Sequence, residues 1–323
     1  MLTSILRSNT IAAFVLSFLL GGIMLLVPCL LWHNGSSGVD LLYAHWAFAW
    51  LQTSQGFAPY LCLLVVSAVA ILSRLHLREA KQVFGNRNLG MVVLVSLVMT
   101  QPQAIFARPD VLVASLVVLA MFLVLLSTYK RDSVLSEVFH VGLLLGVAGL
   151  FVGQSVFLIL PIAFSLLVLR TGNVREWIVL GLGLLMTAVF VMMYAVWQEA
   201  PLLAFMRVIQ SAWSGSVGSE RLNAGHVALI PVTLLGLSAL MGSLTGGTVT
   251  ERNMMLTNGA WIVGTILVLL LLGVGWQNGI VLMAYPLSIL ISLAIEKTSR
   301  WWLADLLLAT VIAAPFVSNL WRL

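Results

Sequence analysis

Long apolar segments separated by short polar turns recur along the whole sequence, and they constrain its fold more than any motif does. Each approaches the length that crosses a bilayer as a helix, about 20 residues. They lie near residues 11–32, 58–73, 89–106, 111–128, 138–153, 155–169, 177–197, 227–245, 256–275, 279–295 and 302–319. The pattern predicts an all-α, polytopic membrane bundle of about 11 spans, in which residues 1–323 form a single integral membrane domain.

The predicted fifth and sixth spans are short and meet at Gly153-Gln154. Two thin crossings and one re-entrant hairpin both fit this pattern, and both return the chain to the same side. Gly142 and Gly146 form a small-xxx-small pair in the fifth span, which predicts a close contact with another helix.

Composition agrees with the membrane class. Hydrophobic residues make up 61% of the 323 and charged residues only 8%, against roughly 25% charged in an ordinary soluble domain. We therefore assign the net charge of +5 to cytoplasmic loops and predict no nucleic-acid partner. Cys29 and Cys62 lie in apolar runs and are interpreted as small hydrophobic residues. The first apolar run lacks a small-residue cleavage site and is expected to remain as a helix.

Lys and Arg are distributed unequally between alternate loops, which predicts the orientation of the chain. With the N-terminus in the cytoplasm, the inside set is the larger and holds every lysine. It comprises Arg7, Arg74, Arg78, Lys81, Arg87, Lys130, Arg131, Arg170, Arg175, Arg252, Lys297 and Arg300, against Arg108, Arg207, Arg221 and Arg322 outside. We expect an inner-membrane, multi-pass protein with a cytoplasmic N-terminus and an external C-terminus.

Groups able to do chemistry concentrate in three loops of the predicted outer face. They are Asp40 and His45 in the first loop, Arg108 and Asp110 in the second, and Glu199, Arg207, Glu220, Arg221 and His226 in the long third segment, 198–226. The inner face, in contrast, carries mostly cations in short loops. Any site is therefore expected to face outward.

Asp40 starts a segment that favours a helix lying along the membrane surface. Ser37-Gly38-Val39-Asp40 has the form of a capping box. Residues 39–54 are rich in Ala, Leu and Trp, which predicts an interfacial helix with its aromatic rings at headgroup level. Helix capping and catalysis are both open for Asp40, because a carboxylate held by backbone donors stays ionised and oriented.

Two of these loops resemble the GT-C membrane glycosyltransferases. The first-loop sequence Asp40-Leu41-Leu42-Tyr43-Ala44-His45-Trp46-Ala47 is similar to the acidic start and Ala-rich face of their juxtamembrane helix. Ala107-Arg108-Pro109-Asp110 is similar to the Arg-Pro-acid motif of their second external loop. The resemblance implies a GT-C-like core over residues 1–200, with residues 201–323 adding spans after a long external loop.

The resemblance also implies a reaction and a set of roles. Asp40 would be the general base on an acceptor hydroxyl, Arg108 would hold the phosphate of a polyprenyl-linked sugar donor, and Asp110 would orient sugar or acceptor groups. This is sensible chemistry, since glycosyl transfer needs a carboxylate on the nucleophile and a cation on the departing phosphate. The further candidates for substrate binding are His45, Arg207 and Arg221. A solvated connector is the alternative for the third segment, in which Pro201 to Trp213 predicts a second interfacial helix.

Departures from the GT-C pattern keep two other functions open. Many relatives have a second acid where this chain has Leu41, and no Asp-x-Asp pair is present for a metal. No metal site or cofactor is therefore predicted. A catalytically inactive subunit of a larger envelope complex, bound to other membrane proteins, is one alternative. A lipid or solute transporter is the other, although no mid-span acid supports ion coupling. The chain also resembles an uncharacterised bacterial membrane family with a cytoplasmic Arg-Glu-Trp, here Arg175-Glu176-Trp177.

Two acids near the predicted cytoplasmic side have simple local interpretations. Glu137 precedes His140 by one helical turn, which favours a local pair. Asp305 lies just inside the last span, beside Trp301 and Trp302 at its cytoplasmic end, and is interpreted as a side chain that reaches to the membrane surface.

Overall fold

The computed structural model of the chain is helical in every regular element that it describes. It describes residues 87–100, 109–129, 131, 133–170, 173–197, 224–272 and 276–320, with single positions between Thr3 and Ile23. In chain order the elements are α5 (Arg87–Met99), α7 (Pro109–Ser127), α8 (Leu135–Phe151), the 3-10 helix η1 (Gly153–Leu158), α9 (Ile159–Leu169), α10 (Val174–Trp197), α12 (Ala224–Gly246), α13 (Val249–Leu272), α14 (Trp276–Lys297) and α15 (Trp301–Leu320). The all-α prediction is confirmed for these residues.

Three helices contain stretches long and apolar enough to cross a bilayer, and they associate the chain with a membrane. The stretches are Val174–Met193, Val227–Gly246 and Trp301–Ser318. Further apolar helices in the described part are shorter. Every span predicted beyond residue 88 overlaps helical structure, with residues 101–106 of the third span outside the described residues. The total of about 11 crossings stays a prediction. The predicted span 58–73, most of 11–32 and the interfacial helices at 39–54 and 201–213 lie outside the described residues.

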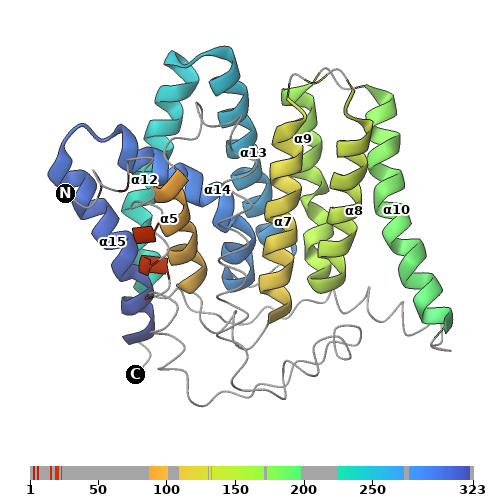
Figure 1. Cartoon of the computed structure of the whole chain (residues 1–323), viewed down its shortest axis with the longest axis horizontal. Coiled ribbons are helices and arrows are strands. Elements are labelled where there is room, and N and C mark those ends of the chain that lie inside the picture. The colour runs from red at the N-terminus through yellow and green to blue at the C-terminus, as the bar shows by residue number, and fades with distance from the viewer. Residues whose placement is uncertain are drawn as a thin grey trace.

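Consecutive helices run in opposite directions, so that their ends gather at two sides of the bundle (Figure 1). α8 packs against both α7 and α10, and α9 packs against α13. α14 contacts α5, α7, α12 and α13, and it therefore joins the two halves of the bundle seen in Figure 1. α15 closes the other edge against α5 and α12.

The contact between α8 and α10 depends on glycine. A methyl group at Gly142 would collide with the carbonyl oxygen of Leu180, and one at Gly183 would collide with the carbonyl oxygen of Phe139. Gly146 faces Thr187, whose hydroxyl donates to the carbonyl of Leu143 across the interface at 3.2 Å. The predicted small-xxx-small contact is confirmed, and it lies within the chain.

The break at Gly153-Gln154 is a sharp turn between two antiparallel helices. α8 ends because Val152 adopts an extended conformation, with φ −132° and ψ 100°, and η1 then leads directly into α9. At 1.5 Å per α-helical residue α8 is about 25 Å long. η1 and α9 together are about 28 Å long, with roughly 2 Å per 3-10 residue. Because these lengths approach the ~30 Å hydrocarbon core, two crossings fit the hairpin better than a shallow re-entrant loop does.

α10 exposes a continuous apolar side. Its exposed residues include Ile178, Leu182, Leu185, Phe190 and Met193. In water such a face would favour aggregation. Among the described helices α10 packs mainly against α8, and lipid tails are the surroundings that suit its exposed apolar side.

Candidate functional site

The outer-loop candidates fall largely beyond the part of the chain that the structure describes. Asp40, His45, Arg108, Arg207 and Arg221 lie outside the described residues. Asp110 and His226 are described at the level of the backbone, as the second residue of α7 and the third residue of α12. Of the motif residues, the structure therefore positions those at the start of α7.

α7 begins at Pro109, directly after Arg108. Proline suits the first helical position, because its missing N–H would have had no partner there and its φ is already helical. The helix dipole places partial positive charge at this end, and the N–H groups of the first turn point away from the helix. α5 and α10 end at the same side of the bundle, and α12 begins there (Figure 1).

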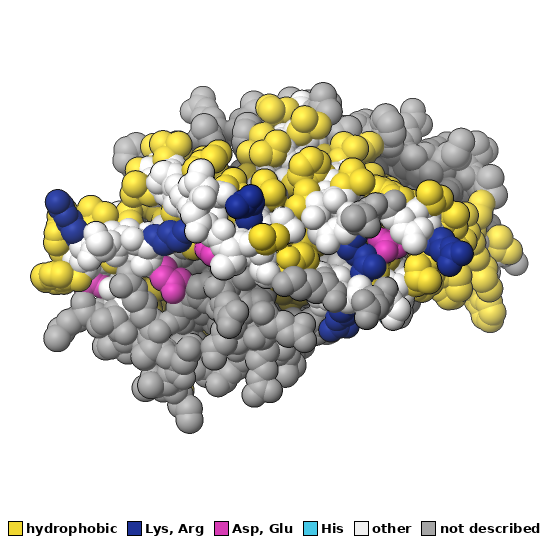
Figure 2. Space-filling model, turned by 90° about the horizontal axis from the view of Figure 1, so that it is seen from above, with side chains coloured by type: hydrophobic (Ala, Val, Ile, Leu, Met, Phe, Trp, Pro, Cys, Tyr) yellow, Lys and Arg dark blue, Asp and Glu magenta, His cyan; other side chains and the backbone are white. Residues whose placement is uncertain are grey.

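The opposite end of the bundle carries the charges. Every Lys, Arg, Asp and Glu whose side chain is described lies on this side, no more than about two helical turns from the nearest helix end. Figure 2 shows these charged side chains in a band across the surface. They are Arg131, Glu137, Arg170, Arg175, Glu176, Glu251, Arg252, Glu296, Lys297, Arg300 and Asp305. We call this side the charged end.

A chain of ionic contacts ties two turns together at the charged end. Arg170 Nε lies 3.0 Å from Glu176 Oε1, and the same guanidinium donates to the carbonyl oxygen of Arg131 at 2.5 Å. Arg131 in turn pairs with Glu137 at 3.0 Å. The turn between α7 and α8 is thereby clamped to the turn between α9 and α10.

Two local predictions at the charged end need revision. Glu137 pairs with Arg131 rather than with His140, whose Nδ1 lies 2.6 Å from the carbonyl oxygen of Ser136. Asp305 does more than reach the membrane surface. Its Oδ1 accepts hydrogen bonds from the backbone N–H of Thr3 at 3.0 Å and from the Thr3 hydroxyl at 2.6 Å. The last helix therefore holds Thr3, a contact across 302 positions that no local pattern could reveal.

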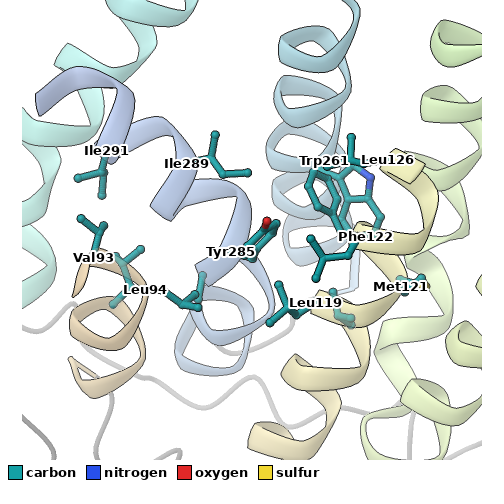
Figure 3. Packing of buried hydrophobic residues seen from close by; sticks show 14 of the residues in the cluster. Val93, Leu94, Leu119, Met121, Phe122, Leu126, Trp261, Tyr285, Ile289 and Ile291 are labelled. Atoms are coloured by element: carbon teal, nitrogen blue, oxygen red, sulfur yellow. The ribbon is translucent and has the colours of Figure 1, made fainter. Parts of the chain in front are cut away.

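An aromatic cluster occupies the interior of the bundle. Phe122 of α7 meets Trp261 of α13 edge-on, with ring centroids 5.0 Å apart, and meets Tyr285 of α14 at 5.3 Å. All three side chains are buried, and Trp261 and Phe122 rank among the largest fully buried residues. Figure 3 shows the three rings converging from three different helices.

Polar atoms in and beside this cluster lack partners among the described residues. Asn258, one turn before Trp261, donates from Nδ2 to the carbonyl oxygen of Pro286 at 3.2 Å. Its Oδ1 is buried without a hydrogen bond, as are Trp261 Nε1 and the Tyr285 hydroxyl. Buried polar atoms are nearly always hydrogen-bonded. Three exceptions on two neighbouring helices therefore mark a second candidate site, which we call the interior polar cluster.

Sequence reasoning missed the interior polar cluster because it searched the spans for charges. The signal was the coincidence of Asn258 and Trp261 in one span with Tyr285 next to Pro286 in the next. Neither pair is unusual by itself, and only the packing of α13 on α14 brings them together.

The fold and the charge distribution define an α-helical membrane protein. A family model described as "Family of unknown function (DUF6427)" matches residues 106–318, and the chain belongs to this family. The matched region runs from the residues just before α7 to α15, so it includes both Arg108 and the interior polar cluster. No curated protein and no solved structure matched the sequence. The match agrees with the expected relation to an uncharacterised family.

Proposed function

We propose that the chain is a GT-C-like membrane glycosyltransferase that takes a sugar from a polyprenyl phosphate at the outer face of the inner membrane. One observation carries the proposal. The Arg108-Pro109-Asp110 motif leads into α7 at the end of the bundle opposite the charged end. If the charged end faces the cytoplasm, as the positive-inside rule favours, this motif faces outward.

The start of α7 suits a lipid-linked phosphate. α7 is 19 residues long, or about 28 Å, close to the thickness of the hydrocarbon core. A helix of this length places its first turn at one membrane surface, where the phosphate of a polyprenyl lipid lies. A helix N-terminus favours anions, and the planar fork of an arginine binds two phosphate oxygens without losing its charge.

The remaining roles are proposals from the GT-C resemblance. Asp40 acts as the acceptor base and Asp110 orients the sugar or acceptor, while His45, Arg207 and Arg221 add contacts to substrate. The partners are the membrane lipid, the lipid-linked sugar and other membrane proteins. No resident cofactor or metal is needed for transfer from an activated phosphate donor, because a base and a phosphate-binding cation supply the required charges.

The test is sugar transfer by purified protein from a panel of polyprenyl-phosphate sugars. Asp40→Asn keeps the size of the side chain and removes the base, and it should lower kcat by about a hundredfold or more. Arg108→Ala should mainly raise KM for the donor. The matched control is Arg300→Ala, which removes an exposed arginine at the charged end and should leave transfer unchanged.

Two outcomes would count against the proposal. Full activity in Asp40→Asn would remove Asp40 from the mechanism. The absence of transfer by the wild type with every donor would favour the inactive-subunit alternative, to which Leu41 in place of a second acid already points. In that case a stable complex with other envelope proteins is the expected finding.

A further inference from the structure

The interior polar cluster lies near the middle of the bundle. Asn258 and Trp261 are central in α13 (Val249–Leu272), and Tyr285 and Pro286 are central in α14 (Trp276–Lys297). The described charged side chains all lie at the charged end, so none faces this level. Polar groups at the depth of the bilayer centre are costly and usually functional.

The unpartnered atoms of the cluster provide both kinds of hydrogen-bonding group. Asn258 Oδ1 accepts, Trp261 Nε1 donates, and the Tyr285 hydroxyl does both. In Figure 3 the indole nitrogen and the phenolic oxygen lie at separate places around the rings. In the described residues, these hydrogen-bond donors and acceptors therefore have no partners, although their side chains pack in one group.

α14 has a built-in point of bending beside these atoms. Pro286 lies inside the helix and has no N–H to donate to the preceding turn, which weakens the helix at that level. At the same level, the Pro286 carbonyl oxygen accepts a hydrogen bond from Asn258 of α13. After Pro286, α14 also contacts α12, where Gly236 packs directly on Leu290.

From these observations we propose that Asn258, Trp261 and Tyr285 form a mid-membrane binding site for a small uncharged molecule bearing a hydroxyl group, uncovered when α14 bends at Pro286. A hydroxyl is the simplest group that both donates to Asn258 Oδ1 and accepts from Trp261 or Tyr285. A charged ligand is disfavoured because no described counter-charge faces the cluster. The inference rests on the interior polar cluster alone and is independent of the proposed glycosyltransferase activity.

Cysteine reactivity tests the proposal directly in the full-length protein. In a background with Cys29→Ala and Cys62→Ala, single Asn258→Cys and Tyr285→Cys variants are treated with 2-hydroxyethyl methanethiosulfonate, a small neutral reagent that itself carries a hydroxyl. The cysteine thiolate attacks the sulfur of such a reagent, forming a mixed disulfide and releasing methanesulfinate. The thiolate forms only where water or another polar group is present. Val263→Cys is the matched control, since Val263 lies on α13 only two residues beyond Trp261 but is 63% exposed on its apolar outer side.

The proposal predicts that both interior cysteines react with the neutral reagent faster than Val263→Cys. It also predicts that they react more slowly with the anionic 2-sulfonatoethyl analogue than with the neutral one. Adding Pro286→Ala should slow the reaction of Asn258→Cys severalfold, because a straight α14 keeps the cluster covered.

A competition experiment distinguishes a polyol such as glycerol from water as the hydroxyl compound that binds. Protection of Asn258→Cys by glycerol, relative to an equally viscous polymer solution, identifies a polyol site, and reaction without such protection identifies a hydrated one.

Interior cysteines that react no faster than Val263→Cys would overturn the proposal. Equal rates with the neutral and anionic reagents would overturn its uncharged ligand class. Having two interior positions guards against the loss of either variant through misfolding, which monodisperse elution of the purified proteins would reveal.

Discussion

Arg170 and Glu176 form an ion pair across the turn between α9 and α10, with Nε 3.0 Å from Oε1 and with side chains only 20% and 7% exposed. Glu176 belongs to the Arg175-Glu176-Trp177 segment in the first turn of α10. Its second oxygen, Oε2, is buried and has no hydrogen-bond partner among the described residues. A carboxylate in such surroundings depends strongly on its one cationic partner.

Replacing Arg170 by Leu should destabilise the protein by about 3 kcal/mol, because the Glu176 carboxylate would stay buried without a counter-charge. The double variant Arg170→Leu/Glu176→Leu should recover most of the loss. Arg175→Leu, which removes the exposed neighbouring arginine, should change stability by less than about 0.5 kcal/mol. Thermal unfolding in detergent measures all three, and equal effects of Arg170→Leu and Arg175→Leu would refute the clamp.

A methyl group added at the α8–α10 contact should force the two helices apart. Gly183→Ala meets the carbonyl oxygen of Phe139, whereas Gly181→Ala, on the same helix, meets nothing within 4 Å. We expect a loss of about 1–3 kcal/mol for the first change and no loss for the second. Unfolding midpoints of the two variants decide the matter, and a tolerated Gly183→Ala would show that the contact is looser than the structure has it.

Tyr285→Phe should leave stability unchanged or raise it slightly. The hydroxyl that it removes is buried and has no hydrogen-bond partner among the described residues, so its loss relieves a desolvation cost. Ser96→Ala provides the contrast, because the Ser96 hydroxyl donates to the carbonyl oxygen of Val311 and joins α5 to α15. That change should cost about 1 kcal/mol. If Tyr285→Phe were the more damaging of the two, the hydroxyl would have a partner in the folded protein.

Asp305→Leu should release the beginning of the chain from α15. It removes the acceptor of both hydrogen bonds from Thr3, whereas Asp305→Asn retains an oxygen at the Oδ1 position. Hydrogen exchange of the Thr3 amide should therefore accelerate strongly in the Leu variant and only slightly in the Asn variant. Exchange at the wild-type rate in Asp305→Leu would argue against the contact.

Apolar periodicity predicted the helices well, because a chain in lipid has few alternatives. Only helices and closed barrels satisfy every backbone group there. Each span predicted beyond residue 88 overlaps helical structure in the described residues, although α13 begins seven residues earlier than expected, at Val249 rather than 256. The polar residues Thr250-Glu251-Arg252-Asn253 hid this start from the hydropathy pattern. Hydropathy indicates which residues lie in the membrane, and a helix can begin before them.

Contacts between distant residues were beyond the reach of the sequence pattern. The spacing of Gly142 and Gly146 predicted a helix contact, but it did not indicate that the partner helix is α10. The pairs Arg170–Arg131 and Asp305–Thr3 join residues 39 and 302 positions apart. The rings of Phe122, Trp261 and Tyr285 meet only because α7, α13 and α14 come together in the interior of the bundle. Of the predicted outer site, the described residues include only the start of α7, so its assembly stays a prediction.

The claim on which the proposed function depends most is that the start of α7 faces outward while the charged end faces the cytoplasm. In the background without Cys29 and Cys62, single Arg108→Cys and Arg300→Cys variants can be treated in intact spheroplasts with a membrane-impermeant maleimide. We predict that Arg108→Cys is labelled at once and that Arg300→Cys is labelled only after the membrane is permeabilised. The reverse pattern would place the Arg-Pro-Asp motif in the cytoplasm and contradict the account.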